Sequence, residues 1–324
     1  MTTVNVGDII TAAQYNDLQT RILKVLGNGS SDYGYGQAIT SDSVAVTQTI
    51  LASHMNDLYA DTVDARTHQT GTVPTTIAQL AVTEIIGADA SNSPNETIKG
   101  HNDYNVVIGQ AETNRLVAAA GQMSAENKIT STRSNNWGNS PDVIQHVVSV
   151  TFPGGQSTKN TSNGNHTASA ADHMRYFFNA GGEIRFSASF AGGSGAKFND
   201  WNSMVTNMGT IKFGRSGTTA TGTGTTSAIG YSNITTSYQQ IFRKTGSGVY
   251  AENDYIIQAR KVGTDTLQFR IYFRDDDSGD QTGLGAPVDE NVGSTLTSTV
   301  SQYRATGSYV SIPTPTYTNN TTLQ

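Results

Sequence analysis

Apolar and polar residues alternate without interruption between Ile184 and Phe190. A strand with one buried face and one polar face has this period of two. Glycine pairs bracket the segment, and further short alternating segments follow it along the chain. We therefore predict that the C-terminal half is an antiparallel sheet structure built outward from this strand.

The other predicted strands share β-branched or aromatic residues at alternate positions, with turn-forming residues between the strands. They are 143–152, 210–213, 238–243, 255–262, 267–273, 296–304 and 309–312. In 267–273 the residues Leu267, Phe269, Ile271 and Phe273 alternate with Gln268, Arg270 and Tyr272. Such short strands favour a β-sandwich, jelly-roll-like, in which the apolar faces of 184–190 and 267–273 pack into one core. The segment 214–230 is nearly all Gly, Thr and Ser and predicts an exposed loop.

A period of 3.6 marks the N-terminal part. In 11–26, Tyr15, Leu18, Ile22 and Val25 form one apolar stripe, Thr11 can cap the start and Gly27 follows the end. The pattern returns at an offset of 40 residues, with identities that include Asn16 and Asn56. Two copies are fewer than a solenoid needs. We predict a duplicated unit, an extended Val-x-Val piece followed by a helix, with the two helices packed as a hairpin.

Further elements complete the predicted organisation. A third helix is expected over 103–120, a short helix over 199–209 with Asp200 as its cap, and a polar loop over 154–170. The irregular stretch 131–141 marks a domain boundary. The fold class is thus α+β, mainly β. It comprises a helical attachment unit over 1–75, a connector over 76–142 and a β-sandwich domain over 143–324.

Composition narrows the possible partners. The 324 residues carry a formal net charge of −6, with scattered Lys and Arg, so nucleic acid is not an expected partner. Without cysteine there is no disulfide and no Cys-based metal site. The start shows no signal peptide, and no run of about 18 apolar residues occurs, so we expect a soluble chain that is neither exported nor embedded in a membrane.

Sequence motifs for catalysis are absent. The chain has no G-x-S-x-G, no phosphate-binding loop, no complete dinucleotide motif and no H-E-x-x-H. His166 and His173 could share a metal, but solvated loop histidines are the favoured interpretation. The cluster Asp275 to Asp280 resembles the start of a calcium loop, yet Ala286 stands where a bidentate Glu is required, which favours a solvated hairpin turn. We expect no cofactor and no catalytic residue.

The N-terminal helices and the loop between them supply the candidate partner contacts. The loop 27–37 combines glycines with tyrosines, which offer rigid amphipathic contact surface. It could dock on a protein partner, or its tyrosines could pack on their own helices. The candidate contacts are apolar or aromatic and are Tyr15, Leu18, Tyr33, Tyr35, Met55 and Leu58.

Eight segments carry a resemblance to known proteins, namely 173–189, 208–213, 228–231, 236–241 and 296–300, together with 15–18, 25–29 and 33–36 near the N-terminus. They resemble virion structural proteins of tailed phages of marine bacteria, especially cyanophages. The resemblance implies a non-enzymatic particle component of the tail, neck or a fibre-like appendage. It also implies a virion location and a homo-oligomer among other virion proteins. The alternative is a receptor-binding module whose Gly, Ser and Thr loops contact host-surface glycan.

Overall fold

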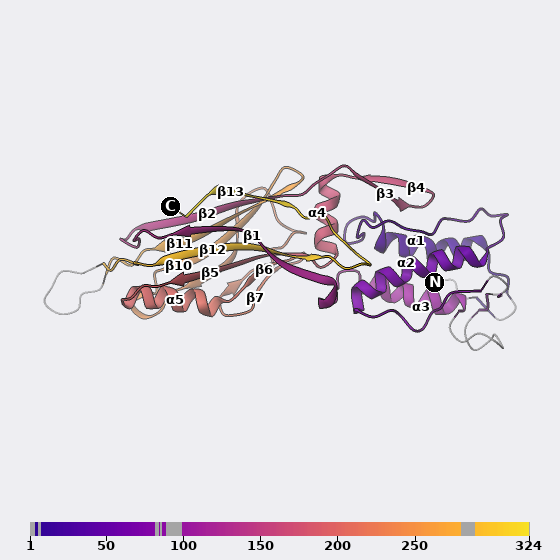
Figure 1. Ribbon diagram of the computed structural model, residues 1–324, viewed down its shortest axis with the longest axis horizontal. Helices are drawn as coiled ribbons and strands as arrows, with labels where there is room; N and C mark the ends of the chain where they lie inside the picture. The colour runs from indigo at the N-terminus through magenta and orange to yellow at the C-terminus, as the bar shows by residue number, and fades with distance from the viewer. Residues whose placement is uncertain are drawn as a thin grey trace. The chain divides into compact units, whose positions relative to one another are not determined.

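A computed structural model of the chain describes residues 4–5, 8–81, 84, 86–88, 99–279 and 289–323. The fold is α+β and mainly β, with antiparallel sheets (Figure 1). The α-helices of the described residues are α1 (Ala12–Leu26), α2 (Ala52–Thr70), α3 (His101–Thr113), α4 (Ala170–Asn179) and α5 (Ala196–Met208).

The chain forms two compact units, and neither is continuous in sequence. Unit 1 comprises Met1–Ser124, Pro153–Gly181 and Arg304–Pro313. Unit 2 comprises Ala125–Phe152, Gly182–Tyr303 and Thr314–Gln324. The sequence pattern instead predicts three consecutive segments, 1–75, 76–142 and 143–324. Chain segments that pass from one unit to the other and back leave no marker in local composition, which is why the sequence pattern does not show them.

Helix α1 has the boundaries that the sequence predicts. Thr11 and Gln14 form a reciprocal capping box, with Gln14 N donating to Thr11 Oγ1 and Thr11 N donating to Gln14 Oε1. The helix ends at Gly27, and Tyr15, Leu18 and Ile22 are fully buried. Within unit 1, α1 contacts both α2 and α3 (Figure 1), so the stripe packs in a group of three helices.

The same pair of hydrogen bonds between an asparagine side chain and the backbone of an extended segment occurs three times in unit 1. Asn16 donates through Nδ2 to Val44 O at 2.9 Å and accepts from Val44 N at 2.8 Å. Asn56 makes the same two bonds to Leu80, at 2.9 and 2.8 Å. Asn102 makes them to Val4, at 3.0 and 3.2 Å. Each helix therefore holds an extended arm that precedes a different helix of the group.

Two predictions for unit 1 need correction. The third helix ends at Thr113, because a turn with Val117 N donating to Asn114 O follows it and the Asn114 side chain binds Gln110 O. The polar segment 154–170 is not a plain loop. It forms the hairpin of β3 (Gln156–Thr161) and β4 (Gly164–Ala168), after which Ser169 caps α4.

Unit 2 contains a five-stranded and a six-stranded sheet, both antiparallel in the pairs resolved between their strands. The five-stranded order is β1-β12-β5-β6-β7 and the six-stranded order is β13-β2-β11-β10-β9-β8. Their bounds are β1 Met123–Arg133, β2 Asp142–Thr151, β5 Glu183–Ala191, β6 Ile211–Phe213, β7 Thr218–Ala220, β8 Thr225–Thr226, β9 Gln239–Thr245, β10 Asp254–Val262, β11 Thr266–Asp275, β12 Thr295–Ala305 and β13 Thr316–Thr321.

The predicted core of unit 2 is confirmed. Phe186 on β5 and Phe269 on β11 are fully buried, and their ring centroids lie 4.9 Å apart. Phe213 on β6 reaches the same ring at 5.2 Å. The apolar faces of the two sheets therefore meet, and the polar residues between them in sequence face outward.

Other boundaries in unit 2 differ from the prediction. Helix α5 begins after Gly195, and Asp200 lies inside it, where its carboxylate accepts from Ser247 instead of capping. The predicted strand 309–312 is not a strand: of its residues, Ser311 forms an isolated bridge with Thr306. The last described strand is β13. The Gly- and Thr-rich segment 214–230 contributes the short edge strands β7 and β8. Strand β1 begins earlier than the boundary predicted at 131–141.

Candidate functional site

Five of the six candidate partner contacts lie in the interior of unit 1. Tyr15, Leu18, Tyr35, Met55 and Leu58 are each at most 1% exposed. Burial raises the pKa of Tyr35 above its usual range, and its hydroxyl accepts from Gln69 Nε2 at 3.0 Å. Tyr33 is half-buried, and Lys24 Nζ lies 3.7 Å from its ring centroid. Packing within the unit thus accounts for these five residues, and contact of the six candidates with a partner stays a prediction.

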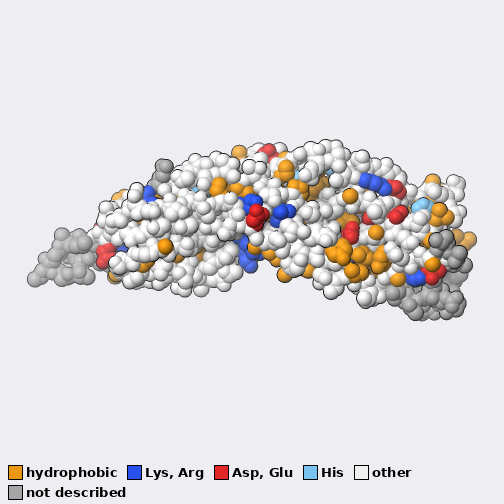
Figure 2. Space-filling view, in the orientation of Figure 1, with side chains coloured by type: hydrophobic (Ala, Val, Ile, Leu, Met, Phe, Trp, Pro, Cys, Tyr) orange, Lys and Arg blue, Asp and Glu red, His pale blue; other side chains and the backbone are white. Residues whose placement is uncertain are grey.

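The two most exposed large apolar residues described in unit 1 belong instead to the arms that precede the helices. Ile9 is 86% exposed and Val46 is 92% exposed. Both line a groove of about 670 Å³, together with Ile10, Ile50 and Ile86. Figure 2 shows orange apolar side chains at the surface of the part of the molecule that holds the helices of unit 1. In the sequence, these apolar arm residues could be recognised because they lie outside the apolar stripes of the helices.

The arms contribute matching positions to this groove. Asp8, Gln48 and Glu84 each close the same turn, in which the side chain accepts the N–H of the residue three positions earlier. Each arm places an isoleucine two residues further on, and Ile10, Ile50 and Ile86 are all half-buried. The groove is therefore an apolar surface with three similar walls, and its charged groups are carboxylates.

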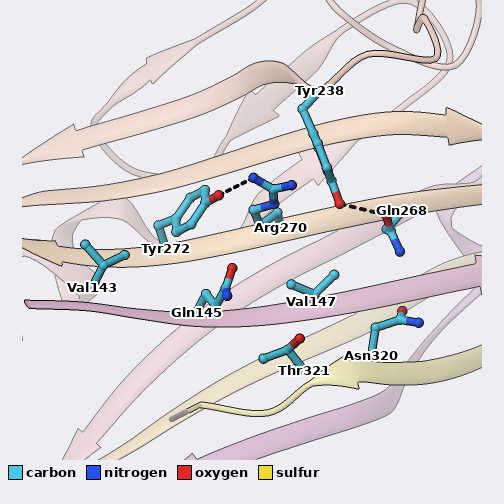
Figure 3. A pocket seen from close by; sticks show the side chains of 9 residues that line it. All are labelled: Val143, Gln145, Val147, Tyr238, Gln268, Arg270, Tyr272, Asn320 and Thr321. Atoms are coloured by element: carbon cyan, nitrogen blue, oxygen red, sulfur yellow. Dashed lines mark hydrogen bonds between the residues drawn. The ribbon is translucent and has the colours of Figure 1, made fainter.

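A second surface lies on the outer face of the six-stranded sheet in unit 2. It is a shallow depression of about 660 Å³ on β2, β11 and β13, next to Tyr238 before β9. Figure 3 shows Tyr238, Arg270 and Tyr272 above the sheet, with Gln145 and Asn320 beside them. Sequence alternation predicts outward positions for Gln268, Arg270 and Tyr272. The sequence does not predict that Tyr238 and β13 lie beside these residues, because only the folded sheet brings them together.

Hydrogen bonds join these polar side chains across the sheet. Tyr238 OH donates to Gln268 Oε1 at 2.7 Å, and Arg260 Nε donates to the same oxygen at 2.9 Å. Gln268 Nε2 donates in turn to Ser149 Oγ at 3.2 Å. Ser149 Oγ donates to Asn320 Oδ1 at 2.6 Å. The network fixes the rotamers of its members and leaves a polar surface that is organised before any ligand binds.

Arginines stack on the tyrosines of this surface. The Arg270 guanidinium lies 3.7 Å from the Tyr238 ring centroid, and that of Arg260 lies 4.4 Å from it. Arg270 Nη1 also donates to Tyr272 OH. Burial opposes the charged form of Arg270, but hydrogen bonds to Tyr272 and Tyr238 outweigh it and raise the pKa. The charged groups of the network are cationic, which suits neutral or acidic ligands with many hydroxyl groups.

The aspartates predicted to form a solvated turn are partly internal. Asp275 and Asp277 are buried around Lys197, whose Nζ lies 3.0 Å from Asp275 Oδ2 and donates to Asp289 Oδ1. Asp280 lies outside the described residues. His166 lies on β4 and pairs with Asp172 at 3.3 Å, and His173 is buried in α4, so neither is the solvated loop histidine that the sequence favours. Among the described residues, no group of three His, Cys, Asp or Glu side chains could hold a metal ion.

No described helix has both the length and the apolar character that crossing a bilayer requires. No protein-family model, curated protein or solved structure matches the chain.

Proposed function

We propose that the protein is a non-enzymatic structural component of a tailed-phage virion, attached through unit 1 to a neighbouring virion protein. The observation that carries the proposal is the groove between the arms, where Ile9 and Val46 stand almost fully exposed. Exposed apolar side chains gathered in a groove are typical of protein interfaces. The virion context rests on the sequence resemblance.

We also infer that unit 1 is built from three copies of an arm followed by a helix. The recurring asparagine contacts and the matching turns at Asp8, Gln48 and Glu84 support this. This arrangement adds one copy to the duplicated helical hairpin that the sequence predicts. A groove walled by equivalent positions offers a partner segment three similar sets of contacts.

For unit 2 we propose a β-sandwich of jelly-roll type, supported by the contact between Phe186 and Phe269 across the two sheets. It would project from the particle or pack against its neighbours. A homo-oligomer among other virion proteins fits a chain that has no cysteine to stabilise it.

Replacing both Ile9 and Val46 by serine should lower incorporation into particles at least about tenfold. An apolar side chain of this size contributes roughly 1.5–3 kcal/mol when it becomes buried, and about 1.4 kcal/mol corresponds to a factor of ten in affinity. The measurement is the copy number of the variant in purified particles, by quantitative mass spectrometry. Val249→Ser, at an exposed position of unit 2, is the matched control and should incorporate normally. Normal incorporation of the double variant would refute attachment through this groove.

A second candidate function is glycan binding by the outer face of the six-stranded sheet. Tyrosine rings stack on the apolar faces of sugars, while Gln, Asn and Arg side chains bond their hydroxyl and acidic groups. Tyr238, Gln268 and Arg270 present this combination on one surface. A host-surface glycan is the ligand we propose, and the two arginines favour one that carries carboxylates.

Tyr238→Ala should weaken binding of such a glycan at least about tenfold. The variant loses the ring that stacks on the sugar, and it also loses the hydrogen bond that holds Gln268 in place. Titration calorimetry with polygalacturonate, and with dextran as the neutral probe, measures this. Tyr303→Ala is the control, because Arg185 stacks on Tyr303 at 3.8 Å on the other sheet in the same manner. If neither polymer binds the unchanged protein, or if both variants bind equally well, this surface is not the glycan site.

A further inference from the structure

The Lys197 ammonium is completely buried among carboxylates in unit 2. Its Nζ lies 3.0 Å from Asp275 Oδ2 and 3.4 Å from Asp277 Oδ2, and it donates to Asp289 Oδ1. It also donates to the carbonyl oxygens of Gly138 at 3.0 Å and of Asp277 at 3.2 Å. Neither the Lys197 nor the Asp275 side chain is exposed to solvent, whereas that of Asp289 is 20% exposed.

Apolar and backbone groups enclose this cluster. Trp201 stands one turn after Lys197 on α5, Trp137 precedes Gly138, and Phe273 precedes Asp275 on the same face of β11. The Trp137 and Trp201 ring centroids lie 4.9 Å apart. Gly138 has φ of +91°, and a Cβ there would lie 2.7 Å from Asp275 Oδ2, so the backbone approaches the carboxylate closely. Water is thereby largely kept from the amine and from Asp275.

We propose that Lys197 and Asp289 join in an intramolecular isopeptide bond, with Asp275 as the proton carrier. A buried amine held against a carboxyl group meets the geometric requirement of amide formation, since the two reacting groups are already in contact. A second carboxyl group on the same amine can then move the protons. The bond would be a covalent staple in a chain without cysteine.

The step balances without a co-reactant. The Lys197 ammonium gives one proton to the Asp275 carboxylate, which passes it to Asp289, and the neutral amine attacks Cγ of the neutral Asp289 carboxyl group. The C–N bond forms as a C–O bond of Asp289 breaks. Asp275 takes a second proton from the nitrogen and gives it to the departing hydroxyl, which leaves as water. One amide N–H remains, and Asp275 is again a carboxylate.

The surroundings assign the roles of the two carboxyl groups. Burial raises the pKa of Asp275 to about 6, so this group accepts a proton more readily than an exposed aspartate, while hydrogen bonds to Asp289 and Asp275 outweigh burial and raise the pKa of Lys197. Ser140 N donates to Asp289 Oδ2 at 2.5 Å, where it can stabilise the oxyanion that develops during the attack. The partial exposure of Asp289 provides a way out for the water that is released.

The bond would link positions 197 and 289 and so enclose most of the six-stranded sheet in a covalent loop. A staple between distant positions restricts the unfolded chain and stabilises the folded one. The same bond would fix the start of α5 to the segment that leads into β12. It is an additional property of unit 2 and does not depend on what unit 1 or the outer sheet face binds.

Intact mass spectrometry of the full-length purified protein tests this. The unchanged protein should be 18 Da lighter than its sequence, and a proteolytic digest should yield a branched peptide joining Lys197 to Asp289. Lys197→Arg and Asp289→Ala should restore the full mass. Asp275→Asn keeps both reacting side chains and should slow or abolish the loss, whereas Asp276→Ala, at the adjacent position, should retain it.

The digest also separates the proposal from related chemistry. A full mass for the unchanged protein overturns the proposal without recourse to any variant. A loss of 18 Da located within one linear peptide identifies a succinimide and overturns it too, as does a branch at Asp275 or Asp277. Circular dichroism of each variant is the folding control. It shows whether a variant with the full mass is still folded.

Discussion

Phe186→Ala or Phe269→Ala is expected to lower the free energy of unfolding of unit 2 by about 3 to 5 kcal/mol. Both rings are fully buried, they lie 4.9 Å apart, and they come from different sheets. Truncation of either ring removes its own buried surface and leaves a cavity beside the other. A loss of this size is a large share of the stability of an ordinary domain.

Neighbouring outward residues provide the matched controls. Arg185 pairs with Glu183 at 2.6 Å and Gln268 takes part in the surface network. Partly exposed contacts of these kinds contribute about 1 kcal/mol or less each. Calorimetry of the full chain compares the four alanine variants. Arg185→Ala and Gln268→Ala falling as far as the phenylalanine variants would mean that burial of the strands is not one-sided.

Asn16→Ala should destabilise unit 1 by about 2 to 4 kcal/mol. The substitution removes two hydrogen bonds to Val44, whose side chain is buried, and leaves a backbone N–H and C=O without their partner. Unsatisfied buried backbone groups cost about 1–3 kcal/mol each. If the three arms are equivalent, Asn56→Ala and Asn102→Ala should have effects of similar size.

Asp17→Ala is the control for this series, because Asp17 is the next residue on α1 and its side chain is 48% exposed. Its ion pair with Arg21 spans 3.7 Å and should contribute at most about 0.5 kcal/mol. Urea unfolding followed by helical circular dichroism measures all four variants. An effect of Asn16→Ala no larger than that of Asp17→Ala would show that the asparagine contacts do not hold the arms.

The elements with a strong local period could be predicted, and those that depend on distant partners could not. The alternation in 267–273 gave β11 and its buried face, and the stripe beginning at Tyr15 gave α1. The hairpin of β3 and β4 has few apolar residues, and its register is set by pairing between the strands. Helix α4 was not predicted, although Ser169 and Asp172 form a capping box at its start.

The third arm does not align with the other two copies at a single offset, because its distance from its helix differs. Asn16 and Asn56 each follow their own arm residue, Val4 or Val44, by 12 positions, whereas Asn102 follows Leu80 by 22. A comparison at one fixed offset therefore aligns two copies and misses the third. The hydrogen bonds of the folded unit match Asn102 with the other two, and Asp103 follows Asn102 as Asp17 follows Asn16 and Asp57 follows Asn56.

The candidate sites were less predictable than the fold, for a physical reason. Charged residues in a row are usually solvated, so Asp275 to Asp277 indicated a turn. Their burial depends on Lys197, which is 78 positions away from Asp275. In the same way, apolar residues on a helical stripe fill the core, and the groove in unit 1 uses Ile9 and Val46, which lie outside the helices.

A density map of the intact particle tests the proposed attachment most directly. We predict that another protein covers the groove at Ile9 and Val46, while Tyr238 and Tyr272 on the outer sheet face lie open to solvent. A map in which the groove faces solvent and unit 2 makes the attachment would contradict it.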